Sequence, residues 1–144
     1  MMARRGATLI ELLVVVLVIG ILANVGLPML RGAVVKADAT HIIADYNAIR
    51  HAAFDYAAEG NAFPRSRGWN RVPPELIDHL PAGFDFEYKS ASYRWRRWSS
   101  RRGSRPVLGL QVRVRNRALH QALERQFEGR LTQVTKTRMT LVIQ

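Results

Sequence analysis

Cysteine is absent from the 144-residue sequence. Its absence excludes a disulfide scaffold, a thiolate metal site and cysteine catalysis. Acidic residues are also scarce, because 22 Lys and Arg stand against 11 Asp and Glu and give a formal net charge of +11. Segment 129–144 contains neither Asp nor Glu, which disfavours a calcium site there, since calcium needs several oxygen ligands.

No residue pattern typical of catalysis is found. The histidines do not follow the spacing of metal ligands; they are His41, His51, His79 and His120. The serines of the arginine-rich stretch 94–117 have no base pattern near them, and no glycine-rich phosphate loop follows a predicted strand. We therefore predict a protein that is not an enzyme and has no metal, no cofactor and no small-molecule substrate.

Charge is missing altogether from residues 12–30, an apolar run with the length of a helix that crosses a hydrocarbon core of about 30 Å. Arg4 and Arg5 precede this run. Basic residues before a membrane helix favour a cytoplasmic N-terminus, so the rest of the chain is expected across the membrane. The sequence thus predicts a single-pass protein of the inner (cytoplasmic) membrane with a periplasmic or other extracytoplasmic head.

Glu11 places a carboxylate at the start of the apolar run. An acid inside a membrane helix costs about 2.5–3.5 kcal/mol on insertion scales. One interpretation is an interfacial residue whose carboxylate reaches the headgroups. The other is a buried acid with a partner.

The string RRGATLIELLVVVLVIGILA, residues 4–23, resembles the N-terminus of type IV pilins and type II secretion pseudopilins. The resemblance implies that a prepilin peptidase cuts after Gly6, that Ala7 begins the mature chain, and that Glu11 is its fifth residue. Pro28 falls where many members of the family have a helix-kinking proline. The family usually has Phe at the position of Ala7, so this departure affects the expected N-methylation more than the cleavage.

The same resemblance supplies a partner for Glu11. In a filament, the new amine of Ala7 in one subunit would lie against the Glu11 carboxylate of a neighbour, and a buried charge would become a paired one. Because four residues make about one helical turn, a contact between Ala7 and Glu11 within one chain is the alternative.

Beyond the apolar run, helical periodicity continues on one face only. The apolar residues of that face are Val35, Ala39, Ile42, Tyr46, Ile49, Ala53 and Tyr56, and Gly60 and Pro64 are expected to end the helix. The polar residues Asp38, Asp45, Arg50, Asp55 and Glu59 are expected to face water or other subunits. The predicted organisation is a leader (1–6), a transmembrane half-helix (7–30), an amphipathic half-helix (31–59), a connecting loop (60–83) and a β-rich head (84–144).

Alternating apolar residues in the head predict about four short antiparallel strands, near residues 84–88, 93–95, 108–114 and 139–143. Asn116 is placed to cap one short helix, with Gly129 just beyond its end. The predicted fold class is α+β and pilin-like: a long N-terminal helix packed on a small sheet.

Arginines are concentrated between the expected strands and on one side of them. Alternation places Arg94, Arg96, Arg113, Arg115 and Arg138 on the face opposite the core, and Arg101, Arg102 and Arg105 in the intervening turn. Such a face suits an anionic partner: an acidic subunit, phospholipid headgroups or nucleic acid. A solvated face or an ordinary subunit contact is the plainer interpretation, and Trp98 is the expected exposed aromatic.

Three functions follow from these patterns. The first is a structural subunit, best described as a minor pseudopilin, that joins other pilins through N-terminal helices in a type II secretion pseudopilus or related filament. Major subunits resembling this chain carry calcium carboxylates or a cysteine pair that it lacks. The second is a minor pilin whose basic head binds DNA, and the third is a lone signal-anchored protein.

Overall fold

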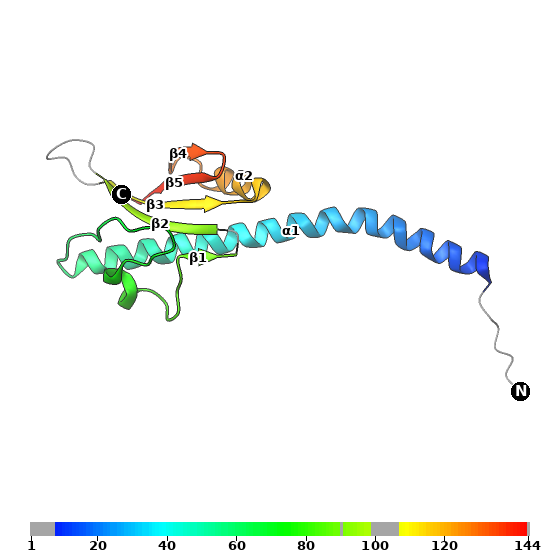
Figure 1. The fold of residues 1–144 in the computed structure, drawn as a ribbon, viewed down its shortest axis with the longest axis horizontal. Helices are drawn as coiled ribbons and strands as arrows, with labels where there is room; N and C mark the ends of the chain where they lie inside the picture. Colours follow the sequence, from blue (N-terminus) through cyan, green and yellow to red (C-terminus); the bar gives the residue numbers. More distant parts are fainter. Residues whose placement is uncertain (1–7, 90, 99–106, 144) are drawn as a thin grey trace, which may run out of the picture. The chain divides into compact units, whose positions relative to one another are not determined.

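The computed structural model describes residues 8–89, 91–98 and 107–143, and the chain divides into two units, residues 1–35 and 36–144. The elements are α1 (Leu9–Ala58), η1 (Pro74–His79), β1 (Glu87–Tyr88), β2 (Ala91–Trp98), β3 (Val107–Val114), α2 (Arg117–Gln126), β4 (Leu131–Thr135) and β5 (Arg138–Val142) (Figure 1). The expected α+β, pilin-like fold is confirmed. The predicted leader, Ala7 and the arginines of the 99–106 turn lie outside the described residues.

The first half of α1 is helical and apolar on every side. Its large side chains are exposed within unit 1–35 along the whole segment; Leu9 near its start is 86% exposed and Met29 near its end is 79% exposed. Pro28 lies inside the helix, which continues through it. A helix that is apolar all round belongs in a nonpolar environment, and this one is long and apolar enough to cross a membrane.

The second half of α1 buries most of the stripe that periodicity predicted, and Val35 and Tyr56 at its two ends are half-buried. Ala39, Ile42, Tyr46, Ile49 and Ala53 are each at most 2% exposed. The helix ends at Ala58, and Gly60 follows with a positive φ of 87°, a conformation that glycine adopts without a steric cost.

Among the described residues, the head sheet has five antiparallel strands in the order β1-β2-β3-β5-β4, one more than expected. The strand absent from the prediction is β4, an edge strand whose residues after Leu131 are all exposed. With no buried face, β4 has no apolar alternation for a sequence pattern to reveal.

One face of the sheet forms the core with α1 and α2. Tyr93, Trp95, Leu110, Val112 and Leu141 are fully buried on this inner face. Their partners across the strands are inward-facing too, since Trp95 pairs with Leu110 and Leu110 pairs with Leu141. Side chains at the alternate positions therefore lie on the outer face.

The predicted capped helix is confirmed as α2. The Asn116 side chain accepts hydrogen bonds from the backbone N–H groups of Ala118 (2.9 Å) and Leu119 (3.3 Å). Phe127, at the end of α2, meets Tyr46 of α1 edge-to-face at 5.2 Å between ring centroids. The helix is thus capped at its start and packed on α1 at its end.

The connecting loop pairs with the free edge of β2. The backbone N–H of Asn70 donates to the Tyr93 carbonyl at 2.9 Å, and that of Arg67 donates to the Trp95 carbonyl at 3.2 Å. The indole Nε1 of Trp95 donates to the Pro64 carbonyl at 3.0 Å. Short β1 alone would leave this edge open, so the loop protects it from pairing with another chain.

Gly109 allows a close approach on the outer face. A Cβ at this position would lie 2.8 Å from Cη2 of Trp98 and 2.9 Å from the Leu141 carbonyl oxygen. The indole of Trp98 therefore packs where a side chain would stand, which corrects the expectation of Trp98 as an openly exposed stacking residue.

We predict that Gly109→Ala destabilises the head by about 1–3 kcal/mol, because an added methyl group forces the indole or the neighbouring strand to move. Gly68→Ala is the matched control, since its nearest neighbour, Cδ of Arg71, would be 3.7 Å away. Urea unfolding followed by circular dichroism measures both variants. Equal stability of the two variants would contradict the packing at Gly109.

Candidate assembly helix and basic sheet face

The exposed apolar half of α1 is the first candidate site. Its run from Leu9 to Leu30 contains no charged residue apart from Glu11, and the large apolar side chains along it are about half or more exposed. Apolar surface of this extent marks a contact with lipid or with other helices. We call residues 9–30 the assembly helix.

Glu11 lies in the first turn of α1. Its backbone N–H lies 3.0 Å from the Thr8 carbonyl oxygen and 3.3 Å from the Thr8 Oγ1. This is one of the two hydrogen bonds of a capping box, the one in which the side chain of the capping Thr accepts from the backbone N–H of the Glu three residues later. The Thr8-x-x-Glu11 pattern precedes an apolar run and signals a helix start, so this cap could have been predicted from the sequence. A carboxylate in the first turn also interacts favourably with the helix dipole.

The second candidate site is the outer face of the sheet. Arg94 and Arg96 lie on β2, Arg113 on β3 and Arg138 on β5. In the strand register Arg113 stands directly opposite Arg138, and Arg94 stands opposite Gln111. We call these four residues the arginine patch.

Two guanidinium groups of the patch meet the same aromatic ring. Cζ of Arg94 lies 4.6 Å from the centroid of the Trp69 ring, and Cζ of Arg113 lies 4.1 Å from it. Nε of Arg94 also donates to Oε1 of Gln111 at 3.0 Å. Burial lowers the pKa of Arg94, and the neighbouring arginines Arg96, Arg138 and Arg113 lower it further. The patch is therefore crowded with like charge.

The structure separates Arg115 from the patch. It follows the end of β3 and lines a surface depression of about 800 Å³ with Arg117 and His120 of α2 and Lys136 of the β4–β5 turn. Strand alternation no longer applies past the end of the strand, so the place of Arg115 on the outer face stays a prediction. Trp69 was not singled out from the sequence, because its place on the sheet depends on the path of the long connecting loop.

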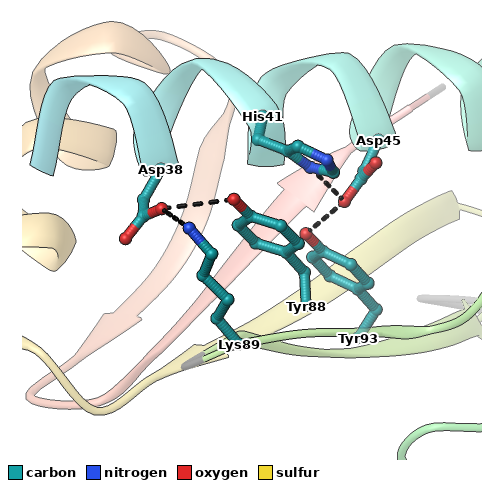
Figure 2. Close-up of polar contacts among 6 residues, drawn as sticks. All are labelled: Asp38, His41, Asp45, Tyr88, Lys89 and Tyr93. Carbon is teal, nitrogen blue, oxygen red and sulfur yellow. Dashed lines mark hydrogen bonds and ion pairs between the residues drawn. The ribbon is translucent and has the colours of Figure 1, made fainter. Parts of the chain in front are cut away.

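A polar seam joins α1 to the start of the sheet (Figure 2). Asp45 accepts a hydrogen bond from the Tyr93 hydroxyl at 2.7 Å, and Nδ1 of His41 lies 3.2 Å from the same carboxylate oxygen. Asp45 was expected to face water or other subunits but is only 8% exposed, because it lies against Tyr93 of the same chain. Burial is the main cause that raises the pKa of Tyr93 above its ordinary value, and the hydrogen bond to Asp45 raises it further.

The other end of the seam is centred on Asp38. Nζ of Lys89 lies 2.9 Å from the Asp38 carboxylate, and the Tyr88 hydroxyl donates to the same carboxylate oxygen at 3.2 Å (Figure 2). The Tyr88 ring stacks on the His41 ring with 3.8 Å between the ring centroids. The hydrogen bond from Lys89 is the main cause that lowers the pKa of Asp38 below its ordinary value of 3.8. The ionised Asp38 carboxylate therefore contributes its full stabilisation above pH 3.8, the ordinary pKa of the group. This contribution is lost as the pH falls through the lower pKa that Asp38 has in the folded state.

Known proteins are similar to this chain chiefly in its N-terminal part. The prokaryotic N-terminal methylation motif matches residues 1–23. No solved structure matches the chain. The resemblance to type IV pilins and type II secretion pseudopilins, expected from residues 4–23, is confirmed.

The relatives include type II secretion proteins and a fimbrial protein. The chain is 36% identical to the type II secretion system core protein G of Klebsiella michiganensis over 89 residues, which cover 57% of this chain and 63% of that protein. It is 36% identical to core protein G of Escherichia coli over 61 residues, 42% of each chain. A fimbrial protein of Pseudomonas aeruginosa is 37% identical over 60 residues, which cover 42% of this chain and 39% of that protein. The match thus spans less than two thirds of each of these relatives.

We predict that Asp45→Ala destabilises the head by about 1–3 kcal/mol, because the buried Tyr93 hydroxyl loses its acceptor. Asp55→Ala, an exposed acid on the same helix, is the control and should stay within about 0.5 kcal/mol of the parent protein. Thermal and urea unfolding measure the difference. If Asp45→Ala proves as stable as Asp55→Ala, the hydrogen bond from Tyr93 to Asp45 does not contribute to stability.

Proposed function

We propose that this protein is a structural subunit, a minor pseudopilin, which a prepilin peptidase cleaves after Gly6 and which assembles through the assembly helix into a type II secretion pseudopilus or a related filament. One observation carries the proposal: an exposed, membrane-length apolar helix whose first part, including Glu11, lies within the N-terminal methylation motif of residues 1–23.

Before assembly, the proposed location of the subunit is the membrane, which the assembly helix spans. Arg4 and Arg5 precede the apolar run, so the N-terminus stays in the cytoplasm and the head faces the extracytoplasmic side. Cleavage creates a charged amine on Ala7. In the filament that amine pairs with Glu11 of a neighbour, and Pro28 lies farther along the same packed helix.

The charge of the chain supports a minor subunit, one present in few copies in the filament. A filament built only of this chain would bring together heads with a large basic excess, because the formal net charge is +11 and the membrane half contributes little of it. Like charges of that size oppose close packing of the compact units. Few copies, placed among less basic subunits, avoid this repulsion.

DNA capture by the basic head is the second candidate function, and the arginine patch is the observation in its favour. Phosphates would neutralise the crowded guanidinium groups. However, Trp69 already contacts two arginines and Trp98 packs over Gly109, which leaves these rings less suited to stacking with bases. We therefore place the structural role first.

Removal of the leader after Gly6 is the first prediction. Mass spectrometry of the membrane-extracted protein from cells with a prepilin peptidase should find Ala7 as the first residue. Gly6→Lys should leave the leader in place, because a bulky charged residue replaces the glycine at the cut, whereas Gly6→Ala should retain some processing. An intact Met1 on the unaltered protein in such cells would contradict cleavage.

The second prediction concerns Glu11. Glu11→Val should insert into the membrane and be cleaved normally, since it makes the helix more apolar. It should enter filaments roughly tenfold less well or worse, because the neighbour's amine loses its partner and breaking a buried ion pair costs about 3–5 kcal/mol.

Crosslinking to other pilin-like subunits in the membrane measures the effect of Glu11→Val. Glu11→Asp, which keeps a carboxylate, is the control and should retain more assembly. Wild-type crosslinking yields for Glu11→Val would refute the paired-charge account.

A further inference from the structure

The arginine patch is surrounded by uncharged side chains. On the outer face its strand neighbours are Ser92, Gly109, Gln111, Thr135, Thr140 and Val142. Within the part of the chain that the structure describes, no carboxylate lies within 4.0 Å of the four guanidinium groups. The acid at the edge of this face, Glu87, accepts a hydrogen bond from the Asn70 amide at 2.8 Å. The charge of the patch is thus not balanced by carboxylates of the described chain.

Part of the patch is also held in position. Trp69 contacts the guanidinium groups of Arg94 and Arg113, and Gln111 accepts from Arg94 while its own Nε2 donates to Thr140 Oγ1 at 3.2 Å. Arg94 and Arg113 are half-buried rather than extended into solvent. Side chains ordered before binding lose less entropy when a partner arrives.

We propose that the outer face of the sheet is a docking surface for an acidic protein partner, namely the head of a different pilin-like subunit. This inference rests on the proposed function and adds to it the contact that would place the chain beside one particular neighbour. Carboxylates of that neighbour would lie between the guanidinium groups and relieve their mutual repulsion. Planar guanidinium groups suit such pairing, because they bind carboxylates through two parallel hydrogen bonds.

The composition of the face favours protein over nucleic acid. The described strand positions of the outer face include arginine and tryptophan but no lysine. Protein interfaces are enriched in arginine and aromatic residues and depleted in lysine. Nonspecific phosphate binding has no such preference, because lysine and arginine both neutralise phosphates.

A second copy of this chain is a poor occupant, since its net charge has the same sign. The partner that satisfies both the proposed filament and the charge is therefore another subunit with an acidic head. Electrostatic complementarity of this kind sets which partner binds and in which orientation.

The test uses the full chain in its native host, with a photo-crosslinking amino acid at Gln133. This exposed residue of β4 is directly opposite Thr140 and belongs to the outer face. A second version carries the crosslinker at Val16 of the assembly helix, where it reports assembly itself. Crosslinked products are identified by mass spectrometry and by nuclease digestion.

The decisive variant is R96Q/R138Q, which leaves the arginines that contact Trp69 unchanged. It should lower crosslinking from Gln133 by about tenfold while crosslinking from Val16 persists. The control R117Q/R125Q removes the same charge from exposed positions of α2 and should leave both signals near the parental level. Equal unfolding midpoints of the two variants would show that folding is not the cause.

Support requires that Gln133 crosslinks to a pilin-like subunit with a net negative head and that only R96Q/R138Q loses this product. Crosslinks to DNA, to lipid or to another copy of this chain overturn the inference, as does an equal loss in both double variants. No product at Gln133 with a clear product at Val16 overturns the docking surface alone. No product at either position overturns the proposed assembly as well.

Discussion

One helix has to satisfy two environments, and the rest of the chain is arranged around that constraint. Residues 9–34 of α1 bury nothing within their own unit, whereas the helix from residue 36 onward buries a stripe against the sheet. The change needs no break in the backbone, because it is a change of side chains from apolar on all faces to apolar on one face. The same secondary structure thereby provides an anchor and the central element of the head core.

Apolar contacts hold the head on α1, but they do not by themselves select one alignment. Leu, Ile and Ala side chains tolerate small shifts along a helix, whereas hydrogen bonds with directional partners do not. The bond from Tyr93 to Asp45 and that from the Tyr46 hydroxyl to the Val142 carbonyl, at 3.0 Å, join α1 to different strands. Because each would leave a buried polar group without a partner if the helix slid by one turn, we infer that they fix its alignment on the sheet.

The sequence predicted what is encoded locally. Helical periodicity located the buried stripe of α1, Asn116 located the start of α2, and alternation located the inner faces of β2, β3 and β5. The features that it missed depend on distant partners. Asp45 resembles a surface acid until Tyr93, far along the chain, supplies its donor, and β4 is a strand only because β5 pairs with it.

The position of the arginines is a consequence of how the core is built. Once Tyr93 and Trp95 face inward, the residues between and beside them must face outward, so the alternation that buries the aromatics also gathers Arg94 and Arg96 on one surface. Arg113 and Arg138 then become direct cross-strand neighbours, an arrangement that disfavours the isolated sheet. Trp69 and Gln111 hold part of this charge but do not neutralise it. Retaining such a cluster costs stability in the free chain, and an acidic neighbour would return that cost as binding free energy, which links the energetics of the sheet to the proposed place of the subunit in a mixed filament.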